Sequence, residues 1–233
     1  MTQTESGATT REPLSRERIL RSAVQLADQD GIEAVTMRSL AGSLGVEAMS
    51  LYYHVENKSA LLDGMVEVVV DEIMDAVSSP DSPPPEQAWK TALRSRILAA
   101  RGVLIRHKWA PEVIESRTVM SPGIVLYHEG VLEILRKGGF SYDLAHHALH
   151  ALGSRALGFT QELFEPDDAA DEQAGEEMLQ HMAADLPYLV GMLSEIVHDD
   201  PDSTLGWCDD QTEFEFGLDV LLDGLENRLQ ERD

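Results

Sequence analysis

The sequence predicts an all-α protein, and three observations support that prediction. Its 233 residues are 43% hydrophobic, enough for a substantial core. Apolar residues recur at helical spacing almost throughout, and no alternating run is long enough to require a sheet. The main breaks are a proline-rich segment, 78–85, and an acidic segment, 166–172. We expect a stiff connector at the first and an exposed loop at the second.

The first expected helix begins after Ser15, a residue whose hydroxyl caps helix N-termini. Ile19, Ala23, Leu26 and Ala27 then share one face. Gly31 is expected to end the helix, because glycine adopts the backbone conformation that closes a helix.

Two shorter helices and a longer one follow. Thr36 is the expected cap of a helix that ends near residues 44–45, and a third helix spans about 48–54. Asn57 is the expected cap of a fourth helix that reaches about Val77.

The remaining elements are also expected to be helical. Ser141 caps one of them, and the glycines at 138–139 end the helix before it. The expected ranges are 86–107, 111–119, 122–137, 142–164, 174–184, 186–198 and 210–231.

Several classes of protein are excluded or disfavoured. No run approaches the roughly 18 apolar residues of a membrane span, and the polar residues 1–10 do not form a signal peptide. The single cysteine, Cys208, forms no internal disulfide, so we expect a cytoplasmic protein. There is no glycine-rich phosphate loop, GxSxG or Cys-His signature. We expect no catalytic residue and no cofactor.

The net charge of −24 is unevenly distributed. Residues 1–66 carry −3, residues 90–155 carry +5, and residues 156–233 carry −20. Because the acidity is concentrated in the last third, the N-terminal part remains compatible with a nucleic-acid partner.

Residues 36–58 carry the most informative pattern. Two short helices meet at Gly45, with the small Ala41 at their crossing and Val46 and Leu51 between them, which is typical of a helix-turn-helix. The second helix would present a set of side chains to a DNA major groove. That set is Ala48, Met49, Ser50, Tyr52, Tyr53 and His54.

The same stretch resembles the DNA-binding domain of the tetracycline-repressor (TetR) family. Its characteristic residues are Leu-Gly-Val at 44–46, Leu-Tyr-Tyr-His-Val at 51–55, Asn-Lys at 57–58 and Ala-Leu-Leu-Asp at 60–63. Residues 214–226 are similar to the last helix of this family. The resemblance implies a homodimer that binds a palindromic operator. It also implies a helix-turn-helix domain at 14–74, with the motif at 36–55, and an effector-binding and dimerisation domain at 75–233.

The resemblance assigns further contacts with DNA. Thr36 and Arg38 would meet the DNA backbone and bases, and Lys58 a phosphate, as their chemistry allows. Arg11, Arg16, Arg18 and Arg21 add local positive charge. Tyr52 has two open roles, packing the hairpin or contacting DNA.

Two apolar stripes leave alternatives open. One is Leu144, Ala148, Leu152, Phe159 and Leu163; the other is Phe214, Leu218, Leu221, Leu222, Leu225 and Leu229. Periodicity is compatible with an ordinary core. It is equally compatible with helices 142–164 and 210–231 pairing with their copies in a dimeric four-helix bundle.

By the same resemblance, an effector cavity would be lined by Met74, Arg96, Ala100, Ile114, Arg117 and Val131, with His128 and His147 nearby. Ile114 stands where tetracycline-binding members of the family have a metal-binding histidine. Isoleucine cannot ligate a hard cation. We therefore expect a larger, mostly apolar effector rather than a magnesium–tetracycline chelate.

Other functions remain as alternatives. His146 and His150 lie one helical turn apart beside His147, a spacing compatible with a metal site, although no cysteine and no HExxH pattern accompanies them. We favour polar residues at an interface or pocket rim and expect no metal. A small-molecule or metal-binding helical protein without operator binding, and an activator of the same fold, are the alternatives to a repressor.

Overall fold

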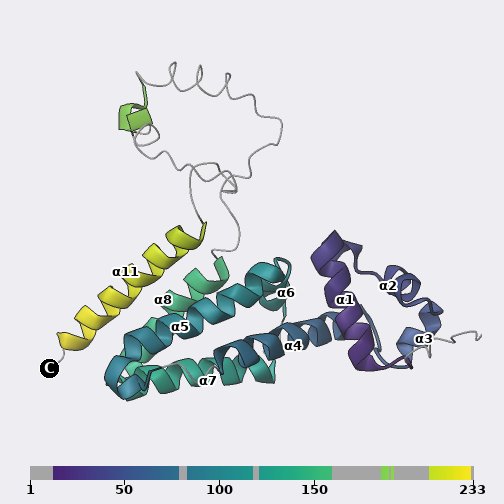
Figure 1. Cartoon of the computed structure of the whole chain (residues 1–233), viewed down its shortest axis with the longest axis horizontal. Coiled ribbons are helices and arrows are strands. Elements are labelled where there is room, and N and C mark those ends of the chain that lie inside the picture. Colours follow the sequence, from purple (N-terminus) through teal and green to yellow (C-terminus); the bar gives the residue numbers. More distant parts are fainter. Residues whose placement is uncertain are drawn as a thin grey trace, which may run out of the picture. The chain divides into compact units, whose positions relative to one another are not determined.

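The computed structural model describes residues 13–78, 83–117, 121–158, 185–188, 190–191 and 210–231 (Figure 1). Every regular element in these ranges is helical, which confirms the expected fold class. None of the described helices is long and apolar enough to cross a membrane. The expected helix at 174–184, the acidic segment 166–172, and Phe159, Leu163 and Cys208 lie outside the described residues.

The chain divides into two compact units, which are described separately. The first contains residues 1–80 and 98–129, and the second residues 81–97 and 130–233. The helices α5 (Pro85–Arg106) and α7 (Pro122–Lys137) each contribute one part to each unit.

The first unit begins with α1 (Arg16–Asp30), a short 3₁₀ turn (Ile32–Ala34), α2 (Met37–Leu44) and α3 (Ala48–Tyr52). We call α1 to α3 the head. Ser15 caps α1 by accepting a hydrogen bond from the Arg18 amide at 3.2 Å, and Gly31 ends the helix, as expected. The sequence did not indicate the 3₁₀ turn. Helix α3 ends two residues early, because a tight turn bonds the His54 amide to the Leu51 carbonyl at 2.9 Å.

Helix α4 (Lys58–Val77) follows the head, and α6 (Ala110–Glu115) packs against it. Asn57 caps α4 through a 2.9 Å bond from the Ala60 amide, again as expected. Helices α1 and α4 approach closely at Gly64, where an added Cβ would lie 2.5 Å from a Leu20 methyl. A side chain at Gly64 would therefore force the Leu20 side chain to shift.

The second unit contains α8 (Tyr142–Gly158) and α11 (Asp210–Gln230), which pack together, with the first half of α5. Phe214, Leu218 and Leu222 are fully buried, and Trp89 meets Phe140 edge to face at 4.7 Å. Leu144, Ala148 and Leu152 are buried as well. These buried residues form core within the single chain, as the first alternative has it, whereas Leu221 and Leu229 are half-buried. The pairing of these helices with their copies stays a prediction.

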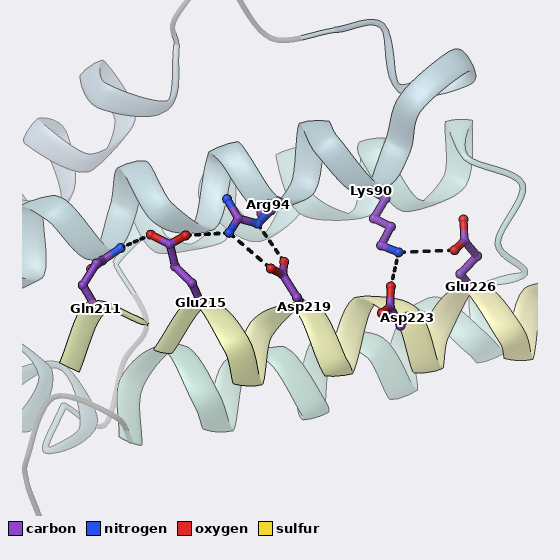
Figure 2. Close-up of polar contacts among 7 residues, drawn as sticks. All are labelled: Lys90, Arg94, Gln211, Glu215, Asp219, Asp223 and Glu226. Atoms are coloured by element: carbon purple, nitrogen blue, oxygen red, sulfur yellow. Dashed lines mark hydrogen bonds and ion pairs between the residues drawn. The ribbon is translucent and has the colours of Figure 1, made fainter. Parts of the chain in front are cut away.

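Ion pairs join α5 to α11 along the edge of this core (Figure 2). Arg94 bonds to Glu215 and Asp219, and Lys90 bonds to Asp223 and Glu226. Hydrogen bonds from Gln211 and Arg94 hold the pKa of Glu215 below its ordinary value. The acidic face of α11 is therefore partly neutralised within the chain.

Candidate functional site

The turn between α2 and α3 is fixed by local hydrogen bonds. Thr36 and Ser39 cap α2 reciprocally, each hydroxyl accepting from the other residue's amide at 3.0 Å. Gly45 adopts the left-handed conformation, φ 63° and ψ 41°, and the Val46 amide bonds to the Ala41 carbonyl at 3.0 Å. Helix α3 is therefore held in a defined orientation to α2.

Helix α3 is anchored by one side chain and presents others to solvent. Leu51 is fully buried, whereas Met49 is 69% and Tyr53 is 87% exposed. His54 is exposed, and Ala48 and Ser50 are half-buried. Tyr52 is 44% exposed, less than its neighbour Tyr53, which leaves both of its expected roles open. The outer face of α3 thus carries large side chains that do not contribute to the core.

Three more of the expected DNA-contacting residues flank this face. Thr36 and Arg38 are exposed at the start of α2. Lys58 is exposed in the first turn of α4, beside the helix N-terminus capped by Asn57. A cation next to free backbone amides favours a phosphate oxygen.

Two arginines of α1 form ion pairs with glutamates of the same chain. Arg16 pairs with Glu67 at 3.1 Å, and Arg21 pairs with Glu17 at 2.8 Å. Arg11 lies outside the described residues. Within the described part of the head, the positive charge of Arg16 and Arg21 is therefore already offset inside the chain.

A polar cluster at the end of α1 was not predicted from the sequence. The buried His107 lies between Asp28, 2.8 Å from Nδ1, and Glu72, 3.3 Å from Nε2. The Trp109 indole donates to the same Asp28 oxygen at 2.7 Å. Burial raises the pKa of Glu72, but hydrogen bonds from His107 and Arg106 outweigh this, so the pKa is below its ordinary value. We call Asp28, Glu72, His107 and Trp109 the His107 cluster.

Four of the expected effector-binding residues belong to the first unit. Ala100 is buried, and Met74 and Ile114 are half-buried. Arg117 lies 3.4 Å from both Ser59 and Asp63 of α4. Its guanidinium is thus held by α4 in this structure.

The other expected effector-binding residues belong to the second unit. Val131 is buried and Arg96 is half-buried. His147 is exposed, 3.9 Å from Asp143 on the same helix. His128, which belongs to the first unit, is half-buried, and its ring bonds to the Ile124 carbonyl at 2.8 Å. All these residues were expected to line one effector cavity. That cavity stays a prediction.

Within the described ranges, the histidines of α8 do not gather further ligands. The rings of His146 and His150 lie 4.6 Å apart. Among the residues that the structure describes, no group of three or more His, Cys, Asp or Glu is placed to hold a metal ion. Glu162, a conceivable additional ligand, lies outside these residues.

Two family models match the chain. One, described as bacterial regulatory proteins of the tetR family, matches residues 19–65. The other, described as the tetracyclin repressor-like C-terminal domain, matches residues 82–229. The chain belongs to the tetR family. It is accordingly a ligand-responsive transcriptional repressor with a helix-turn-helix DNA-binding domain and a ligand-binding domain.

Characterised relatives match most of the chain. The HTH-type transcriptional repressor DrrR1 of Streptomyces coeruleorubidus is 29% identical over 94% of this chain and 80% of its own length. The class C tetracycline repressor protein of Escherichia coli is 29% identical over 91% of both chains. A TetR-family protein, ActR of Streptomyces coelicolor, solved with actinorhodin, is 25% identical with a TM-score of 0.68, over 92% of this chain and 96% of its own.

Proposed function

We propose that this tetR-family regulator acts as a homodimer that binds a palindromic operator near a promoter and leaves it when a small, largely apolar effector binds. The observation that carries the proposal is the outer face of α3, where Met49 and Tyr53 are exposed on a helix anchored by Leu51. A rigid helix with large exposed side chains suits recognition of base edges in a major groove. The role is regulatory rather than catalytic, and we place it in the cytoplasm with the chromosome.

The head supplies two kinds of contact in this proposal. Lys58 binds a phosphate, while Thr36 and Arg38 meet the backbone and bases from α2. The recognition residues are Ala48, Met49, Ser50, Tyr52, Tyr53 and His54. We retain 14–74 as the DNA-binding domain and 75–233 as the effector-binding and dimerisation domain.

The dimer forms through α8 and α11 in this proposal, but not through their buried stripes. On α11, Phe216 is 66% and Val220 is 55% exposed. These two residues lie one turn apart on the side opposite Leu218 and Leu222. An exposed aromatic and a β-branched residue on one helix face support an interface with a second copy.

The effector is proposed from the residues expected to line its cavity. Ile114 and Val131 are apolar and Ala100 leaves room, while Arg96 and Arg117 provide positive charge. A mostly apolar molecule carrying an acidic or phenolic group fits this set. ActR, solved with actinorhodin, supports a large organic ligand. A coupling of about 1–3 kcal/mol between the two sites would weaken operator binding roughly 5- to 150-fold.

A gel shift with the DNA that flanks its own gene tests the proposal. We expect the wild-type protein to bind and both Tyr53→Ala and Lys58→Ala to lose affinity. Lys108→Ala is the matched control, since it removes an exposed lysine outside the head. Equal weak binding by wild type, both head variants and the control would overturn operator recognition and favour a helical binding protein that does not act on DNA.

A further inference from the structure

We propose that His107 is a positioning residue whose protonated ring joins α1 to α4 and thereby makes operator affinity depend on pH. The proposal rests on the proposed operator binding, but its geometry is independent of DNA. Asp28 lies in α1, which is part of the head, and Glu72 lies in α4, whose first residue is Lys58. A residue bonded to both elements fixes the two DNA-contacting parts relative to each other within this unit.

The chemistry of the partners defines the protonation state. A neutral imidazole has one donor and one acceptor nitrogen, whereas an ionised carboxylate only accepts. Nδ1 lies 2.8 Å from an Asp28 oxygen and Nε2 lies 3.3 Å from a Glu72 oxygen. Only the imidazolium form can donate to both.

The alternative, a protonated carboxyl that donates to a neutral ring, is disfavoured. Asp28 also accepts from the Trp109 indole at 2.7 Å, and Glu72 also accepts from Arg106 at 3.1 Å. Both bonds favour the ionised carboxylates. Burial raises the pKa of Glu72, yet the hydrogen bonds from His107 and Arg106 hold that pKa below its ordinary value.

The wider surroundings carry more negative than positive charge. His107 lies at a groove of about 680 Å³ between α1 and α4, which gives the buried ring a route to solvent protons. The α5 side contributes Arg106, and Lys108 is adjacent in sequence and exposed. The charged groups that line the groove with His107 are Arg16, Glu17, Arg21 and Asp28 from α1, and Glu67, Asp71, Glu72 and Asp75 from α4.

Loss of the ring proton has a defined consequence. One nitrogen then turns a lone pair toward a carboxylate, so one of the two bonds is replaced by a repulsive contact. Asp28 keeps its bond from Trp109, whereas the bond from His107 to Glu72 on α4 is lost. A head held less firmly to α4 has to be ordered on binding DNA, so operator affinity falls as pH rises.

Glu72→Gln is the decisive variant because it keeps the shape and removes the charge. The side-chain amide that this substitution introduces can donate to Nε2 of a neutral ring while Nδ1–H still donates to Asp28. We expect wild-type operator affinity to fall about tenfold once the ring has lost its proton, and the variant to change less than about twofold over the same pH range. Glu67→Gln, the matched control on α4, should keep the wild-type slope.

Nitrogen-15 NMR of the full-length protein without DNA gives a second readout. We expect both His107 ring nitrogens to carry protons in wild type under the conditions where operator affinity is highest, and only one in Glu72→Gln under the same conditions. A singly protonated wild-type ring, or equal pH slopes in wild type and both variants, overturns the proposal. If no operator is bound at any pH, the proposed function fails, and the NMR comparison still decides the state of His107.

Discussion

Arg94 on α5 and Asp219 on α11 form a two-pronged ion pair, with Nε and Nη2 donating to the two carboxylate oxygens at 2.7 and 3.2 Å. The same guanidinium also reaches Glu215 at 2.6 Å. A planar guanidinium suits this arrangement and an ammonium does not. These bonds fix how the first half of α5 lies along α11 (Figure 2).

We therefore expect Arg94→Lys to destabilise the protein although the charge is kept. Because the three side chains are between 33% and 45% exposed, the loss should stay at about 1 kcal/mol. That corresponds to a decrease in Tm of about 2–4 °C for a chain of this size. Thermal unfolding measures it. Arg228→Lys, at an exposed pair with Glu231, should leave Tm unchanged. An equal decrease of Tm in both variants would show that the two-pronged geometry at Arg94 does not add to stability.

The buried and exposed faces of α11 should respond differently to a carboxylate. Leu222 is fully buried, so Leu222→Glu should lower the free energy of unfolding by several kcal/mol and unfold the protein. Val220→Glu places the same charge on the exposed face and should give a folded monomer that no longer binds the operator. Light scattering and circular dichroism separate the outcomes. A dimeric Val220→Glu protein would place the interface on another surface.

Gly64 and Gly42 offer a matched pair of glycine-to-alanine tests. At Gly64 the new methyl group would lie 2.5 Å from a Leu20 side-chain atom, whereas at Gly42 nothing lies within 4 Å. We expect Gly64→Ala to cost about 1–3 kcal/mol, and Gly42→Ala to be neutral or stabilising by up to about 1 kcal/mol. Denaturant unfolding checks both values. Equal stability of the two variants would contradict close packing of α1 on α4.

Operator binding should depend only moderately on salt. Arg38 and Lys58 are exposed on each head, while Arg16 and Arg21 are engaged by glutamates. About four phosphate contacts in a dimer correspond to a slope of log K against log salt near −4. Lys58→Ala should reduce the slope by about 2. A measured wild-type slope near about −10 would mean that many more cations reach the DNA.

A magnesium–tetracycline chelate should not release the operator, even though class C tetracycline repressor protein is among the relatives. Ile114 and Val131 offer no oxygen or imidazole donor for the cation or the drug. Titrating tetracycline with and without Mg²⁺ into the protein–operator complex tests this. Release at about micromolar drug, abolished by EDTA, would contradict the expectation.

Local features of the fold were predictable from the sequence and long-range ones were not. Helix capping is local, because the side-chain oxygen of the capping residue accepts a hydrogen bond from the backbone amide three residues later. The expected caps therefore formed at Ser15, Thr36 and Asn57. Leu222 belongs to an apolar stripe that the helical spacing of the sequence identified. That spacing does not specify whether helices of the same chain or a second copy of the chain cover the stripe. His107 and Asp28 are 79 residues apart, and no pattern in the sequence connects them.

The shared Asp28 oxygen limits how regulators of this kind are recombined. A chimaera that exchanges the first 57 residues for those of a relative keeps the helix-turn-helix whole, yet it separates Asp28 from the His107 and Trp109 that hold it. Where the transplanted α1 has no carboxylate at the position of Asp28, the indole and the imidazole lose their acceptor. In such a transfer of operator specificity, moving residues 107–109 together with the head keeps this oxygen and its two donors in one piece.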